Sequence, residues 1–514
     1  MGLIRLWLFL LFVPLLFSTG CAVNPVTGKN ELSLISEAEE IEMGAKQYIP
    51  SQQAQGGQYI TDPKLIAYVN RVGQRVAAAG DRDLPYEFVV LNNSVPNAWA
   101  LPGGKISINR GLLIELNSEA ELAAVLGHEA VHAAAKHGAN SVQRGMLLQG
   151  LMTATEIGAA MSGSDYSNYV VGGAQLGAQL ISQKYGRNAE LESDYYGTQY
   201  MAKAGYDPAA AISLQETFMR LSEGQQSSFI DGLFASHPPS NDRVIANRNT
   251  VEELGNPGGE VGVDSYQKAV AFLRSNDYAY ESFDHAQSLF AKGEYDSARG
   301  NLNTALKQLP SEARFHGLLG NIHYQQKNYA GAEAAYARAI ELDNNYFEYY
   351  LGRGLVSSKQ GDRTQAKRFL EKSNELLPTA LASQELGQLS LAAGNRAEAK
   401  NYFSSAMGAG GALGRNATSS FIQLDLPDNP GRYFRVEPKK SDTGYLIATI
   451  TNLTPVSISA LSIEFRAIVN GQPYTRIVNM PITASDTEDA ISGLQLSNED
   501  VVTDVSVTVV GAIL

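Results

Sequence analysis

The stretch that decides the fold of the central domain is residues 118–136, which read SEAELAAVLGHEAVHAAAK. Ser118, with a glutamate three residues later, is typical of a helix N-terminus, and the alanine-rich run predicts a helix to the end of this stretch. His128 and His132 are one helical turn apart, so both imidazoles would lie on one face and could bind the same Zn²⁺. Glu129 lies between them and could reach a water beside that metal. Since the chain has only 7 histidines, this spacing predicts a zinc site.

The acidic segment 187–194 offers the third protein ligand that a catalytic zinc needs beside one open position. Glu190 and Asp194 are four residues apart and share a helical face. We predict that Glu190 is the third ligand and that Asp194 accepts a hydrogen bond from a ligand imidazole, which fixes its tautomer. On a continuous helix Glu192 would lie about 200° round the axis from Glu190, and His137 about 140° from His132. We therefore expect neither side chain at the metal. Taken alone, the segment is also typical of a solvated acidic helix.

Several other segments have the pattern of a known family. They are Asn97–Gly104 (NAWALPGG), Gly111–Leu113 (GLL), Glu121–Gly127 (ELAAVLG) and Ser236–Arg243 (SHPPSNDR). Together with the zinc motif and the Glu190-x-x-x-Asp194 pair, they resemble the HtpX- and BepA-like zinc metallopeptidases over roughly residues 30–250. This gluzincin family also includes the prenyl-protein endopeptidases. The resemblance implies a mainly α, zincin-like domain with a small sheet, which hydrolyses peptide bonds with one Zn²⁺ and uses Glu129 as the general base.

The segment around His237 and Arg243 has a second implied role. By resemblance, both side chains face the catalytic cleft, where they could stabilise the tetrahedral oxyanion. In some relatives of this architecture the histidine can occupy the open position of zinc and hold the enzyme inactive, so His237 is also a candidate latency ligand. Without the family context, a His-Pro pair in a loop is typical of a plain turn.

The N-terminal segment that ends at Cys21 has the pattern of an export signal. One charge, Arg5, precedes a twelve-residue apolar run that is too short to span a bilayer, and Cys21 follows the small residues Ser18-Thr19-Gly20. This resembles a bacterial lipoprotein signal. It implies that residues 1–20 are removed, that Cys21 carries the lipid, and that the protein lies on the periplasmic side of the bacterial cell envelope; Ala22 favours the outer membrane. The alternative is an ordinary cleaved signal followed by an incidental cysteine.

A repeated pattern follows a linker at residues 255–259. Ala298, Ala332, Ala366 and Ala399 recur with a period of about 34 residues, and each follows a short polar turn. The period resembles the tetratricopeptide repeat, so we expect an α-solenoid with a concave groove that binds partners. A plain structural spacer is the alternative.

The period changes to two beyond a glycine-rich stretch, 408–414, which we interpret as a second linker. Apolar and polar residues alternate in four segments, and Asn470-Gly471 is a strong hairpin signal. These features predict a β-sandwich-like domain. The predicted division of the chain is a signal peptide at 1–20, a metallopeptidase domain at 21–254, about four repeats at 264–407 and the β domain at 417–514.

The charge balance and the single cysteine limit the function. The net charge is −13, which argues against generic binding of nucleic acid, and one cysteine cannot form a disulfide within the chain. We expect a membrane-anchored periplasmic zinc metalloendopeptidase that acts on protein or peptide substrates in quality control or assembly of envelope proteins, with repeats that dock to envelope assembly machinery. The alternatives are a non-catalytic tetratricopeptide-repeat lipoprotein adaptor with a latent zinc site, and a membrane-embedded prenyl-protein endopeptidase, which the lack of a spanning segment disfavours.

Overall fold

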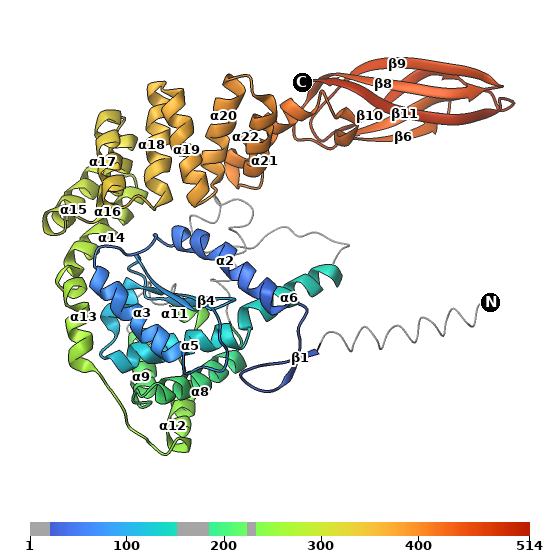
Figure 1. Cartoon of the computed structure of the whole chain (residues 1–514). Helices are drawn as coiled ribbons and strands as arrows, with labels where there is room; N and C mark the ends of the chain where they lie inside the picture. The colour runs from blue at the N-terminus through green and yellow to red at the C-terminus, as the bar shows by residue number, and fades with distance from the viewer. Residues whose placement is uncertain (1–20, 152–184, 224–232) are drawn as a thin grey trace, which may run out of the picture. The chain divides into compact units, whose positions relative to one another are not determined.

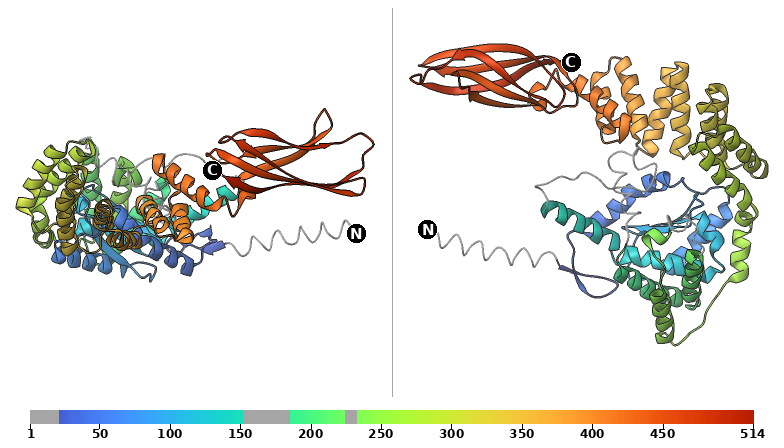
Figure 2. Two further views of the ribbon diagram at one scale, coloured as in Figure 1. Left: turned by 90° about the horizontal axis from the view of Figure 1, so that it is seen from above. Right: turned by 180° about the vertical axis from the view of Figure 1, so that it is seen from behind.

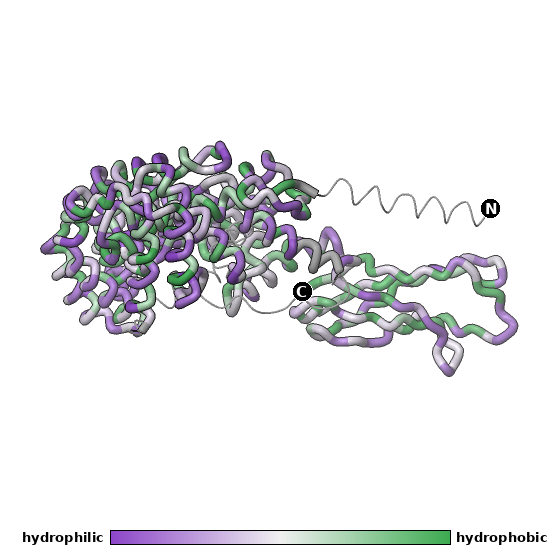
Figure 3. The backbone as a smooth tube through the Cα atoms, turned by 90° about the horizontal axis from the view of Figure 1, so that it is seen from below, coloured by the Kyte–Doolittle hydropathy of each residue, from purple (hydrophilic) through white to green (hydrophobic). Residues whose placement is uncertain are grey.

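The computed structural model describes residues 21–151, 185–223 and 233–514, and it is mostly helical with small sheets (Figure 1). The predicted signal peptide, residues 1–20, lies outside the described residues. Hydrophobic and hydrophilic residues alternate over short lengths of the backbone (Figure 3). Among the described helices, none is both long and apolar enough to cross a membrane.

The chain forms two compact units, Met1–Pro378 and Thr379–Leu514. The first unit contains a three-stranded sheet with β5 (Lys105–Asn109) in the middle. β3 (Glu87–Leu91) runs parallel to β5, and β4 (Ala98–Leu101) runs antiparallel to it. β4 lies within the family segment Asn97–Gly104 and forms one edge of this sheet.

Helices cover both faces of this sheet. One face packs into a core shared with α3 (Pro63–Ala77) and α5 (Glu119–Ala134), and the other packs against α2 (Glu37–Ala54). Local sequence explains where these helices begin, because the side chain of Asp62 accepts hydrogen bonds at the start of α3 and that of Ser118 does so at the start of α5. The helix start predicted at Ser118 is therefore confirmed.

Helix α8 (Arg187–Lys203) crosses α5 at two glycines. A Cβ atom at Gly197 would lie 2.9 Å from the backbone N of His128, and one at Gly127 would lie 3.0 Å from the carbonyl O of Gly197. The two backbones are thus in direct contact, which brings the first turns of α8 opposite the histidines of α5. The other helices of this part of the chain are α4 (Arg110–Glu115), α6 (His137–Leu151), α9 (Ala210–Glu223), α11 (Leu233–Ser236), α12 (Asn241–Glu253) and α13 (Val263–Ser275).

The repeat region of the first unit consists of three antiparallel helix pairs (Figure 2). The helices are α14 (Asp277–Ala291), α15 (Tyr295–Gln308), α16 (Ala313–Gln325), α17 (Tyr329–Leu342), α18 (Phe347–Gln360) and α19 (Arg363–Leu376). The key residues Ala298, Ala332 and Ala366 are fully buried, each near the start of the second helix of its pair. A small side chain at this position lets the helices approach closely, so the helical repeats agree with the predicted period.

The second unit begins with α20 (Ala380–Ala392), α21 (Arg396–Ala406) and α22 (Gly411–Asp425). Helix α22 contradicts the predicted linker at 408–414, because it begins inside that stretch. Its end is held by packing: Ile422 belongs to the hydrophobic core of the strands that follow. Tertiary burial has outweighed the low helix propensity of the glycines.

The strands of the second unit form two antiparallel three-stranded sheets with a shared core. The first sheet has the order β10-β7-β6 and the second β11-β8-β9. Their bounds are β6 (Phe434–Lys440), β7 (Tyr445–Asn452), β8 (Ile458–Val469), β9 (Gln472–Ile482), β10 (Thr487–Gln495) and β11 (Val502–Ile513). Asn470 and Gly471 have φ angles of 50° and 79° between β8 and β9, as the predicted hairpin turn requires. The sequence did not predict β6 and β10, which lie at sheet edges.

Candidate metal centre

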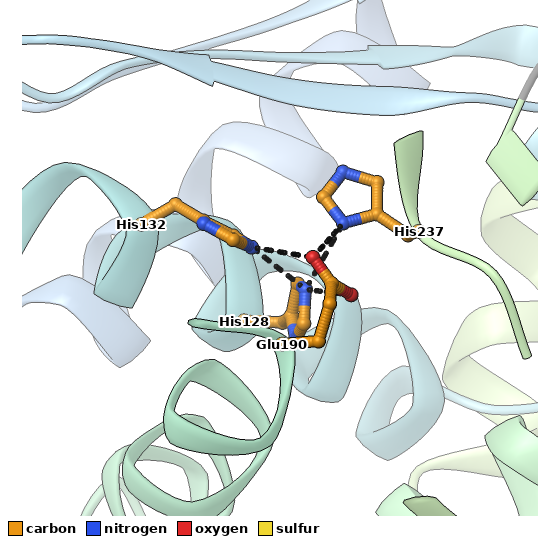
Figure 4. A group of neighbouring side chains, drawn as sticks. All are labelled: His128, His132, Glu190 and His237. Atoms are coloured by element: carbon orange, nitrogen blue, oxygen red, sulfur yellow. Dashed lines mark hydrogen bonds and ion pairs between the residues drawn. The ribbon is translucent and has the colours of Figure 1, made fainter. Parts of the chain in front are cut away.

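Four side chains converge between α5, α8 and the segment that follows α11 (Figure 4). The Nε2 atoms of His128 and His132 are 3.0 Å apart. One oxygen of Glu190 lies 3.4 Å from Nε2 of His132 and 3.0 Å from Nδ1 of His237, and its other oxygen lies 3.6 Å from Nε2 of His128. All four residues are buried. The structure therefore brings together the three predicted ligands and the predicted latency ligand.

The distances and the protonation of the cluster fit a metal ion such as zinc. Ligand atoms at 2.0–2.2 Å from a tetrahedral Zn²⁺ are roughly 3.3–3.6 Å apart, and the contacts measured in the cluster are 3.0–3.6 Å long. Burial lowers the pKa of His132 well below its ordinary value, so its imidazole is neutral, as a ligand must be. Burial favours the protonated acid at Glu190, but the neighbouring His237 and the hydrogen bonds from the histidines hold its pKa below the ordinary range.

Asp194 orients His128 and is itself held by Arg243. Oδ1 of Asp194 lies 2.9 Å from Nδ1 of His128, which leaves Nε2 of that ring free for a metal. Arg243 donates to both oxygens of Asp194, from Nε at 2.6 Å and from Nη2 at 2.7 Å, and its Nη1 lies 3.0 Å from Glu190. Burial would raise the pKa of Asp194, but Arg243 lowers it to about 2. Arg243 therefore fixes two carboxylates of the centre.

Glu129 lies beside the cluster and is almost fully buried. Its Oε1 is 3.5 Å from Nε2 of His237, and its Oε2 has no hydrogen-bond partner among the described residues. Burial raises the pKa of Glu129, although His237 and His128 oppose the shift. A pocket lined by α5, α8, α9 and α12 opens here, and Glu129, His237 and Arg243 all line it. A carboxylate in this position can take a proton from a water that enters the pocket.

His137 is not among the four clustered side chains, as expected, but it contacts the ligand candidate His132. The prediction assumed a continuous helix, but α5 ends at Ala134, Lys136 adopts a left-handed conformation with φ 61°, and α6 begins at His137. The turn brings Nδ1 of His137 to 2.9 Å from Nδ1 of His132, while its Nε2 lies 3.2 Å from Glu192. Glu192, which was also assigned no role, thus contacts the centre through His137. No signal in the sequence marks the left-handed residue.

Tyr185 is a further residue that the sequence did not indicate. Its ring stacks on His132 with the ring centroids 4.1 Å apart and an interplanar angle of 26°. Burial raises the pKa of its phenol. Tyr185 precedes α8 by two residues, so only the tertiary fold brings it to the histidine.

This fold and this site define a metalloendopeptidase, a hydrolase in which a His-Glu-x-x-His helix supplies two metal ligands and a general base. The chain belongs to peptidase family M48, whose sequence pattern matches residues 63–251, and a tetratricopeptide repeat pattern matches residues 283–347. The family resemblance drawn from the motifs is therefore confirmed.

Several curated relatives share the metallopeptidase region. The beta-barrel assembly-enhancing protease of Yersinia pestis is 26% identical over 373 residues, which cover 65% of this chain and 74% of that protein. The metalloprotease LoiP of Escherichia coli is 30% identical and covers 35% of this chain and 67% of that protein. The mitochondrial metalloendopeptidase OMA1 of Schizosaccharomyces pombe is 35% identical over 34% of this chain, which spans 50% of that protein. Among solved structures, a crystal structure of MamA is 22% identical, covers 31% of this chain and 91% of that chain, and has a TM-score of 0.24.

Proposed function

We propose that the chain is a zinc-dependent endopeptidase of the bacterial cell envelope. The observation that carries the proposal is the convergence of His128, His132 and Glu190 on one point with Glu129 beside it. When bound, Zn²⁺ would polarise the scissile carbonyl and acidify the attacking water. Oε2 of Glu129 would accept the proton of that water and deliver it to the leaving amine. Arg243 acts in this scheme by orienting Asp194 and Glu190.

His237 gives the centre a latent form. Its Nδ1 lies 3.0 Å from Glu190 and 3.3 Å from Nε2 of His128, close enough for His237 to serve as a fourth zinc ligand. A catalytic zinc needs an open position, so we infer that His237 must move before a substrate can bind. The same contacts favour the second candidate, a non-catalytic adaptor with a latent zinc site.

Metal analysis and cleavage of casein by the purified full chain test the proposal. We expect about one Zn²⁺ per chain and cleavage that a chelator abolishes. Glu129→Gln should keep the metal and lose turnover, because an amide cannot take the proton. His237→Ala should cleave faster than the wild type with the same metal content. Cleavage by Glu129→Gln at the wild-type rate would refute the mechanism, and an inactive His237→Ala would favour the adaptor.

The envelope location and the partners rest on other observations. Two relatives from bacteria are a beta-barrel assembly-enhancing protease and LoiP, and we propose envelope proteins as substrates and envelope assembly machinery as the partner of the repeats.

Cys21 opens the β1–β2 hairpin, Cys21–Val23 paired with Asn30–Leu32. Asn24 of this hairpin donates to the carbonyl of Ala135 at the end of α5, so a lipid on Cys21, anchored to the outer membrane, would hold the metal centre near the membrane surface.

Crosslinking in the native envelope tests these assignments. Glu129→Gln should trap substrates and partners together, and Cys21→Ser should remove the lipid label and release the protein from the membrane fraction. A Cys21→Ser protein that stays in the membrane fraction would contradict the anchor.

A further inference from the structure

His132 has two ring nitrogens with different neighbours. Its Nε2 faces the ligand cluster, whereas its Nδ1 faces Nδ1 of His137 at 2.9 Å. The two ring centroids are 4.9 Å apart at an interplanar angle of 72°, so the contact runs edge to face. Behind His137, its Nε2 lies 3.2 Å from Oε1 of Glu192. The side chains of His137 and Glu192 are 11% and 20% exposed, so both contacts are largely shielded from water.

The protons of this chain can be assigned from the contacts alone. A metal ligand must offer a lone pair, so a His132 that binds through Nε2 carries its proton on Nδ1. Among the residues that the structure describes, that proton faces Nδ1 of His137, which must therefore be unprotonated to accept it. His137 then carries its own proton on Nε2 and donates it to Glu192, a carboxylate that only accepts. Every hydrogen bond in the row Glu192–His137–His132 has one donor and one acceptor.

We propose that His137 is a positioning residue that selects the metal-binding tautomer of His132, and that Glu192 sets the tautomer of His137. Asp194 fixes the tautomer of His128 in the same way but by direct contact, because it lies 2.9 Å from Nδ1 of that ring. Helix α8 thus supplies a carboxylate for each histidine ligand of α5. The proposal rests on the proposed zinc site, and it assigns functions to two residues that the catalytic scheme does not use.

Two plainer interpretations of His137 do not fit its geometry. It is not a fifth ligand, because its Nδ1 faces the nitrogen of His132 that points away from the cluster. It is not merely a surface residue at a helix start, because both of its ring nitrogens have buried or half-buried partners. The turn at Lys136 is what directs the ring back over the last turn of α5.

The test measures Zn²⁺ affinity in the full chain by competition with a chromophoric chelator, so it does not depend on cleavage. His137→Leu should bind Zn²⁺ about 10–100-fold more weakly, which is the usual loss when such a partner is removed. His137→Gln should recover most of the affinity, because its amide oxygen can accept the proton of His132. Casein cleavage by His137→Leu should need a higher Zn²⁺ concentration than cleavage by the wild type, and His137→Gln should restore most of the wild-type requirement.

A charge reversal tests the outer residue. Glu192→Lys replaces an acceptor with a donor, so Nε2 of His137 must become the acceptor and its proton must move to Nδ1. That proton would face the proton on Nδ1 of His132, so the Zn²⁺ affinity should fall at least tenfold. Gln199→Lys is the matched control, because it adds a cation on the same face of α8 seven residues further along.

Three outcomes would overturn the role of His137. They are a His137→Leu affinity within twofold of the wild type, equal losses in His137→Leu and His137→Gln, and equal affinities of Glu192→Lys and Gln199→Lys. If His137→Leu does not fold, the Glu192→Lys comparison decides. A wild-type chain that binds no Zn²⁺ would refute the proposed function. If the wild type binds Zn²⁺ tightly and His137→Leu has the same affinity, only this inference is refuted.

Discussion

Glu312 joins the repeats to the peptidase domain within the first unit, and removing its carboxylate should destabilise that unit. The side chain is almost completely buried. Oε1 accepts hydrogen bonds from Nδ2 of Asn92 at 2.8 Å and from the backbone N–H of Arg314 at 3.2 Å. Oε2 accepts from the hydroxyls of Thr61 at 2.8 Å and Tyr280 at 2.9 Å. Two of these donors belong to the peptidase domain and two to the repeats.

The size of the effect follows from what each donor can do after Glu312→Ala. The amide of Asn92 and the backbone N–H of Arg314 cannot become acceptors, and each unpaired buried donor costs about 1–3 kcal/mol. The two hydroxyls can rotate towards other partners and lose less. Because such losses are not additive, we expect the free energy of unfolding of the first unit to fall by about 2–5 kcal/mol, somewhat less than the sum of the separate costs.

Tryptophan fluorescence during denaturant unfolding provides the assay. Trp99 is buried in the first unit, and Trp7→Phe leaves it as the sole tryptophan of the chain. Glu341→Ala is the control: this glutamate is exposed on a repeat helix and pairs with Arg338 at the surface, so its loss should change the free energy by less than about 0.5 kcal/mol. Equal unfolding midpoints for Glu312→Ala and Glu341→Ala would refute the assignment of Glu312 as the link.

Acid and chelation give two more predictions. The carboxylate of Glu119 is buried, which raises its pKa, but hydrogen bonds from Tyr68, Tyr206 and Arg71 outweigh this effect and lower it. The ionised carboxylate therefore stabilises the fold above its unfolded pKa of about 4.5, and this stabilisation is lost as the pH falls through the lower folded pKa. Below pH 4.5 the free energy of unfolding of the wild type should fall more steeply than that of Glu119→Gln. Parallel curves of the free energy of unfolding against pH would contradict this. Removal of Zn²⁺ should lower the thermal midpoint of the first unit, because zinc at 1,000 times its dissociation constant contributes about 4 kcal/mol; unchanged midpoints would argue against a metal bound by the folded state alone.

Local signals in the sequence predicted the features that depend on a few neighbouring residues. The helix start at Ser118 follows from one side chain that accepts a hydrogen bond from the next turn, and the helical repeats follow from the regular recurrence of a small residue after a polar turn. The errors arose where long-range packing decides. Helix α22 forms despite its glycines because Ile422 is buried in the β core, and the stacking of Tyr185 on His132 joins residues that are far apart in the sequence.

The metal centre itself shows how packing and chemistry are encoded together. On α8, Glu190, Asp194 and Gly197 are spaced by four and three residues, so they form one stripe along the face that meets α5. Gly197 lies against the backbone of His128, and this contact sets the distance between the helices. With the backbones touching, a short Asp reaches Nδ1 of His128 and a longer Glu, one turn earlier, reaches the metal position. Glu192 lies off this stripe, so it contacts His132 indirectly, through the ring of His137. The turn at Lys136 places that ring between them. The position of each carboxylate along and around α8 therefore decides which histidine it contacts. A motif written as residue spacings contains only part of this information.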